Sequence, residues 1–172
     1  MNIKKMVQLS MFTTIALTIF VVESYLPPLA PIPGIKLGLA NTITLIVLAL
    51  WGWKEGMLVL FLRILLGSML TGNVISCCFS LGGGILCFLV MSLLKTIVPQ
   101  KMIWLLSVIG AVFHNIGQLL VACIVLESSS VFWYFPILLT SGIITGTFTG
   151  VAAQYVVIRY GYMFRKKRES NK

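Results

Sequence analysis

The chain of 172 residues contains no aspartate, and its acidic side chains are only Glu23, Glu55, Glu127 and Glu169. Enzymes that act on diphosphates hold magnesium through clustered carboxylates, because Mg²⁺ prefers oxygen ligands. Four scattered glutamates do not provide such a cluster. The lack of aspartate therefore argues against any chemistry that needs carboxylate clusters to hold magnesium or a diphosphate.

Other catalytic motifs are also missing. The glycine-rich stretch GGGILC at residues 82–87 lacks the lysine and hydroxyl residue of a Walker A loop, and there is no HExxH or GxSxG. The single histidine, His114, has no group of zinc ligands around it. We expect no metal, no cofactor and no enzymatic activity. The four cysteines lie in apolar runs and are expected to be free and to pack as small apolar side chains: Cys77, Cys78, Cys87 and Cys123.

Charged residues are scarce in general. They make up 10% of the chain, against about a quarter in soluble domains, while hydrophobic residues make up 59% and the mean hydropathy is +1.04. The net charge of +9 comes from lysines and arginines near the ends and in short loops, as membrane topology requires, so it does not indicate nucleic-acid binding. These features predict one all-α integral membrane domain.

Six segments are long and apolar enough to cross a bilayer, at residues 7–26, 36–53, 55–72, 75–95, 102–126 and 132–158. The first is too long for the apolar part of a signal peptide, so we expect it to be retained. The fourth contains Gly82, Gly83 and Gly84, each of which costs about 1 kcal/mol in a helix, so a broken or re-entrant helix is the alternative there. Residues 165–172 are expected to form a basic tail.

The positive charges indicate the orientation of this domain. With six crossings both termini lie on one side, which then holds eleven lysines and arginines, whereas the other side holds only Lys36. The positive-inside rule places that richer side, and both termini, in the cytoplasm of a cell membrane protein. The RKKR run at 165–168 is expected to anchor the chain or to attract anionic membrane lipid.

Arg63 is the most costly residue in the predicted membrane. It lies within LVLFLRILLGSML, and an arginine at this depth costs roughly 2.5 to 3.5 kcal/mol on insertion scales. Glu23 is expected near the outer end of the first segment and Glu55 near the inner end of the third, so no acid is expected at the depth of Arg63. Either an anionic ligand (a diphosphate, a phosphate or a carboxylate) or backbone carbonyls and amides must then satisfy this guanidinium.

Two further segments carry polar side chains. Asn41 follows Lys36 within GIKLGLANTITL. His114, Asn115 and Gln118 share one helix face, because they are separated by three or four residues. Such groups either join helices by hydrogen bonds or line a cavity. We favour a shared polar cavity with Arg63, in which Lys36 at the outer mouth attracts an anion.

Stiff and small residues mark two other features. The segment LPPLAPIPG at residues 26–34 is a non-helical strap, either a rigid connector or a lid over an outward-facing cavity. Small residues at four-residue intervals permit close helix packing. We expect the stripe in the sixth segment, Gly142, Gly146 and Gly150, to pack within the bundle, and the stripe in the first, Ser10, Thr14 and Thr18, to dock a separate subunit.

The segments PPLAPIPGIKLGLANTITLIVLALWGWKEGMLVLFLRILLGSMLTGN and GAVFHNIGQLLVA resemble the Gx transporter family, whose members are often labelled heptaprenyl diphosphate synthase component I. The resemblance covers nearly the whole chain. It implies a relation to the S-components of energy-coupling-factor transporters, which are six-helix substrate-binding subunits with cytoplasmic termini and a stiff first outer loop. Those proteins work with a coupling membrane subunit and ATPases, and their first helix meets the coupling subunit.

Two functions follow as expectations. The first is a substrate-binding membrane subunit for a small organic or isoprenoid- or cofactor-related anion, held by Arg63 with Asn41, His114, Asn115 and Gln118 and energised by partner subunits. The second is a non-catalytic membrane subunit of a heptaprenyl diphosphate synthase or of a quinone or flavin redox assembly.

Overall fold

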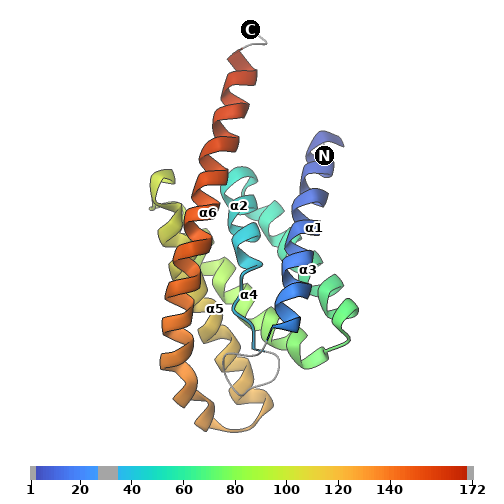
Figure 1. The fold of residues 1–172 in the computed structure, drawn as a ribbon, viewed down its shortest axis with the longest axis vertical. Helices are drawn as coiled ribbons and strands as arrows, with labels where there is room; N and C mark the ends of the chain where they lie inside the picture. The colour runs from blue at the N-terminus through green and yellow to red at the C-terminus, as the bar shows by residue number, and fades with distance from the viewer. Residues whose placement is uncertain (1–2, 27–34, 170–172) are drawn as a thin grey trace.

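The computed structural model describes residues 3–26 and 35–169, with side chains up to residue 161. These residues form six α-helices joined by loops and two short 3-10 helices, and no strand occurs among them. The helices are α1 (Ile3–Tyr25), α2 (Asn41–Trp51), α3 (Trp53–Thr71), α4 (Val74–Leu94), α5 (Ile103–Val125) and α6 (Phe135–Glu169). Helix α1 begins and α6 ends at the same end of the bundle (Figure 1). The proline strap, predicted to be a connector or a lid, lies mostly outside the described residues.

Four stretches of the described chain are long and apolar enough to cross a membrane, as a membrane protein requires: Ile3–Tyr25, Val74–Leu94, Gln100–Val125 and Ser129–Gly161. Helices α2 and α3 are not among these four stretches, each for its own reason. Helix α2 has only 11 residues, and α3 contains Lys54, Glu55 and Arg63. The protein is therefore an all-helical chain with membrane-type helices around a shorter, buried one.

The fourth segment is a continuous helix in spite of its glycines. Helix α4 runs unbroken through Gly82, Gly83 and Gly84, and the broken or re-entrant alternative is wrong. These glycines let α5 approach closely: a Cβ added at Gly117 would lie 2.6 Å from the carbonyl oxygen of Gly82. The glycines thus serve helix contact rather than a break.

The second segment departs from the prediction. A helix was expected over residues 36–53, but α2 begins only at Asn41, and residues 35–38 form no regular secondary structure. Gly38 has a φ of +78°, a left-handed conformation that favours glycine and stops a helix from extending further back. Such non-helical backbone inside a bundle must be covered by protein, and Ile35, Lys36 and Ala40 are buried.

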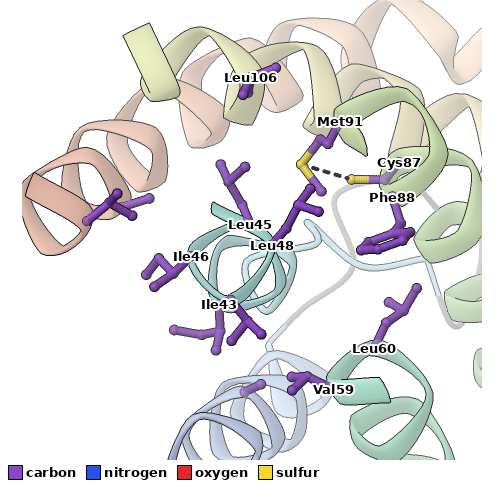
Figure 2. Close-up of a cluster of buried hydrophobic side chains, with 14 of the residues drawn as sticks. Ile43, Leu45, Ile46, Leu48, Val59, Leu60, Cys87, Phe88, Met91 and Leu106 are labelled. Carbon is purple, nitrogen blue, oxygen red and sulfur yellow. Dashed lines mark hydrogen bonds between the residues drawn. The ribbon is translucent and has the colours of Figure 1, made fainter. Parts of the chain in front are cut away.

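Helix α2 lies at the centre of the bundle. It contacts α1, α3, α4, α5 and α6, and all eight residues from Asn41 to Leu48 are buried. Figure 2 shows Leu45 and Leu48 of α2 near Phe88 and Met91 of α4, with other apolar side chains around the rest of α2. A helix that is apolar on all sides is expected in such a position. The N-terminal end of α2 therefore lies in the interior of the molecule.

The glycine stripe of α6 packs within the bundle, as predicted. A Cβ added at Gly146 would lie 2.8 Å from Val108 Cα, and one at Gly150 would lie 2.7 Å from the Trp104 carbonyl oxygen. A Cβ at Gly142 would meet the Asn115 side chain at 2.8 Å. Glycine at these three positions lets the backbones of α5 and α6 come into contact.

The end of the bundle where α1 begins is closed by side-chain contacts. Phe12, Trp51 and Tyr160 form a cluster of edge-to-face rings with centroids 5.4 to 6.4 Å apart. Beside it, Lys5 of α1 pairs with Glu55 of α3. Helices α1, α3 and α6 and the end of α2 are thereby tied together, so the access to the interior described below lies at the opposite end.

Candidate anion-binding site

The site begins with Glu23 on α1. This side chain is 5% exposed, and its carboxylate accepts hydrogen bonds from the backbone N–H groups of Gly38 and, at 3.4 Å, Leu39. Those two donors belong to the non-helical segment that leads into α2, where no helical carbonyl can pair with them. Glu23 thus holds residues 38 and 39 in place and fixes the position at which α2 starts.

Arg63 projects from α3 to the first residue of α2. Its side chain is 2% exposed, and Nη2 donates to Asn41 Oδ1. The Nε of Arg63 and the Nδ2 of Asn41 are buried and have no hydrogen-bond partner in the described structure. The predicted meeting of these two residues from separate segments is therefore found, and it leaves donors of both side chains unused.

His114 of α5 lies on the other side of the same segment. A Cβ added at Gly38 would lie 2.5 Å from His114 Cδ2 and 2.8 Å from Asn41 Nδ2, and one at Gly83 would lie 2.7 Å from His114 Nδ1. The imidazole thus occupies the space that two glycines leave free. Its Nε2 lies 3.0 Å from Nε2 of Gln118, one turn further along α5. Both residues join the Arg63 and Asn41 cluster.

Asn115 is placed differently. It is buried, but its Nδ2 donates at 2.6 Å to the carbonyl oxygen of Leu138, and it faces Gly142 of α6. Asn115 therefore joins α5 to α6 and is not brought into the cluster with Arg63. The three residues were predicted to share one face of α5. Instead, Asn115 faces α6, whereas His114 faces Gly38 and Gly83 and lies beside Gln118.

Lys36 is largely buried and lies at the wall of a cavity described below. It is 8% exposed, its Nζ donates to Ser24 Oγ at 2.6 Å, and the ammonium lies 3.3 Å from the centre of the Phe20 ring. The interaction of a cation with an aromatic face is favourable and strengthens when water is excluded. Because α1 supplies both Ser24 and Phe20, the position of Lys36 depends on that helix.

Arg63 was expected to have no acid at its own depth, and Glu23 lies in the last turn of α1. Glu23 is buried and interacts electrostatically with both Arg63 and Lys36, although it lies in no ion pair within 4 Å. Position in the sequence placed Glu23 at the outer end of α1. In the structure, residues 38–41 connect the two groups, because Glu23 accepts from the N–H groups of Gly38 and Leu39 and Arg63 donates to Asn41.

A cavity of about 330 Å³ lies beside Glu23 and Lys36, at the end of the molecule opposite the start of α1. Among the described residues, its walls come from the end of α1, the segment before α2, the end of α3 and the start of α4: Glu23, Ser24, Tyr25, Leu26, Ile35, Lys36, Leu70, Thr71, Asn73 and Ser76. Ser76 lines this cavity, and its hydroxyl oxygen is buried without a hydrogen-bond partner.

The small residues predicted for partner docking face outward. Ser10, Thr14 and Thr18 are exposed, and the two threonine hydroxyls donate to the carbonyl oxygens of Ser10 and Thr14 within α1 itself. The described bundle therefore does not use this stripe. The four cysteines are free, and no group of three potential metal ligands occurs among the described residues.

Sequence reasoning missed several members of the site, namely Glu23, Ser24, Gly38, Gly83 and Ser76. The available signal for Glu23 was its type and place: it is one of four acidic residues, and it lies in an apolar segment. The two glycines carry no chemical signal, because their role is to make room for His114.

These features define a class of protein: an all-helical membrane-type bundle that holds a buried cluster of two cations, one carboxylate and several amides beside a cavity. The family model described as heptaprenyl diphosphate synthase component I matches residues 12–156, and the chain belongs to that family. No curated protein and no solved structure matches the chain.

Proposed function

We propose that the protein is a substrate-binding membrane subunit that takes up a small organic anion and works with separate energy-supplying subunits. The single observation that carries this proposal is the convergence of Arg63, Lys36, Asn41 and His114 at the buried start of α2. Four polar side chains from the segment before α2 and from three helices are costly to gather inside a membrane protein. A ligand that uses them offsets that cost.

Each residue has a role in the proposal. Arg63 and Lys36 supply positive charge, while Asn41, His114 and Gln118 orient the bound molecule through hydrogen bonds. Polar groups left without partners in the cluster support this assignment, in particular Arg63 Nε and Gln118 Oε1. The 330 Å³ cavity gives access from the end away from the aromatic cluster of Phe12, Trp51 and Tyr160.

The membrane arrangement belongs to the same proposal. All six helices lie within the bilayer, with the short α2 enclosed by the other five, and both termini lie in the cytoplasm. The basic residues support this orientation, because α1 begins with Lys4 and Lys5 at the same end where α6 finishes in RKKR. The exposed stripe of Ser10, Thr14 and Thr18 is the surface for the coupling subunit.

The experiment that tests the function is retention of a metabolite. Purified protein is incubated with a small-molecule extract of the cells that make it, washed, denatured, and its bound molecules are identified by mass spectrometry. Arg63→Ala serves as the comparison, and Asn115→Ala as the matched control from outside the cluster. The proposal expects an anionic molecule retained by the wild type and the control but lost from Arg63→Ala. Equal retention by all three proteins would refute it.

A second function has its own support, because the family description names a synthase component. In this alternative the protein is a non-catalytic membrane partner of a soluble prenyl synthase subunit. The absence of aspartate supports a non-catalytic role in either case. Co-purification separates the two: a synthase subunit that remains bound while no small molecule is retained favours the alternative.

A further inference from the structure

We infer that the ligand carries a single negative charge, and that Glu23 is the residue that sets this limit. The inference deepens the proposed function and rests on it. It names the charge class of the substrate and adds a specificity-determining residue that the sequence did not indicate.

The first step is the charge already present in the protein. Lys36, Arg63 and Glu23 are 8%, 2% and 5% exposed, and they interact electrostatically with one another. When all three groups are ionised, two cations and one carboxylate leave one positive charge uncompensated. An uncompensated charge removed from water is costly, and a single anion placed beside it removes most of that cost.

The second step is that Glu23 cannot simply move away to admit a more highly charged ligand. Its carboxylate accepts the backbone N–H groups of Gly38 and Leu39, which have no helical partner of their own. Withdrawal of Glu23 would leave these donors unsatisfied inside the bundle. The carboxylate is therefore a fixed part of the site, and it repels a second negative charge on a ligand.

The third step locates the anionic group. Lys36 and Ser76 both line the cavity. Lys36 uses one N–H on Ser24 and places its ammonium over the Phe20 ring, so donor capacity remains, since an ammonium has three N–H groups. The Ser76 hydroxyl is buried without a partner. These two side chains are the contacts for the charged end of the ligand, and the buried Arg63 adds positive potential without lining the cavity.

The cavity volume adds a limit on size. About 330 Å³ lies at the lower end of the range of small-molecule pockets, which is about 300 to 1,000 Å³. A short molecule with one carboxylate or one phosphodiester fits this description. A long polyprenyl diphosphate fits neither the charge nor the volume.

The test compares three probes that share one short tail: hexanoate, hexyl diphosphate and hexanol. Binding of labelled probes to the full-length protein in detergent is measured by equilibrium dialysis. The wild type is expected to bind hexanoate at least tenfold more tightly than either other probe. Glu23→Gln adds one net positive charge and should shift the preference toward hexyl diphosphate by at least tenfold.

Lys36→Gln is a second variant that leaves the hydrogen bonds between Glu23 and the backbone in place, so the inference can still be tested if Glu23→Gln does not fold. It should abolish the preference for hexanoate over hexanol, whereas Lys101→Gln, which removes an equal charge at an exposed site, should leave it unchanged. If the wild type prefers hexyl diphosphate and the Arg63→Ala variant no longer binds it, this inference is overturned while the proposed function stands. Failure of the wild type to bind any of the three probes would count against both.

Discussion

The ring of Phe20 on α1 lies against Gly67 of α3, where an added Cβ would come within 2.3 Å of the ring carbon Cδ1. The same ring carries the ammonium of Lys36, 3.3 Å from the ring centre. A glycine on α3 thus determines where a cation of the site rests. This relation explains why a small residue follows Arg63 by four positions in LRILLGS.

The first prediction concerns that contact. Gly67→Ala should lower the free energy of unfolding by about 1 to 3 kcal/mol, because the base of the Phe20 ring cannot move aside without a shift of α1. Thermal unfolding in detergent measures the loss. Gly161→Ala is the matched control, since nothing lies within 4 Å of a Cβ there. If both variants unfold at the same temperature, the contact between α1 and α3 is not as close as described.

The second prediction concerns the crossing of α4 and α5. Gly117→Ala should be at least as destabilising as Gly67→Ala, because the new methyl group meets backbone atoms of Gly82 and Gly83 rather than a side chain. It should also weaken ligand retention, since α5 carries His114 and Gln118. The same thermal and retention assays apply, and an unchanged melting temperature would contradict the packing of these helices.

The third prediction separates two neighbouring polar residues of α5. Gln118→Ala should reduce ligand retention at least tenfold, because it removes a group of the cluster beside His114. Asn115→Ala should leave retention unchanged and cost about 1 kcal/mol of stability through loss of the hydrogen bond to Leu138. Equal effects of the two changes on retention would contradict the separation of Gln118, beside His114, from Asn115, which pairs with Leu138.

The fourth prediction concerns the exposed stripe on α1. Thr14→Leu or Thr18→Leu should weaken association with a coupling subunit, because bulkier side chains keep the helices apart. Co-purification of the tagged protein from its native membrane measures this. Thr147→Leu, exposed on α6, is the control. Unchanged recovery of membrane partners in the α1 variants would remove the stripe from the docking surface.

Sequence patterns were sufficient for much of the fold. Apolar runs located all six helices to within a few residues at most ends, because burial in lipid demands long apolar segments. They failed at the start of α2. There, the left-handed conformation of Gly38 and the hydrogen bonds to the Glu23 carboxylate prevent the helix from beginning before Asn41. Both effects depend on contacts with a distant part of the chain. The sixth helix also runs further than predicted, to Glu169.

The candidate site was predictable in part and for a clear reason. Arg63, Asn41, His114 and Gln118 are polar residues in apolar runs, and such residues tend to find one another inside a membrane protein. Their meeting at the start of α2 agrees with this. Glu23 was missed because the return of residues 35–40 into the bundle is a tertiary effect that local sequence does not encode.

The most direct test of the account is native mass spectrometry of the gently purified protein, wild type beside Arg63→Ala. The account predicts that the wild type carries a bound small anion, seen as a discrete mass increase that collisional activation releases. Arg63→Ala should remain folded and show the mass of the chain alone. A wild type without any retained molecule, or an Arg63→Ala protein that carries the same one, would contradict the claim that this buried cluster is a binding site.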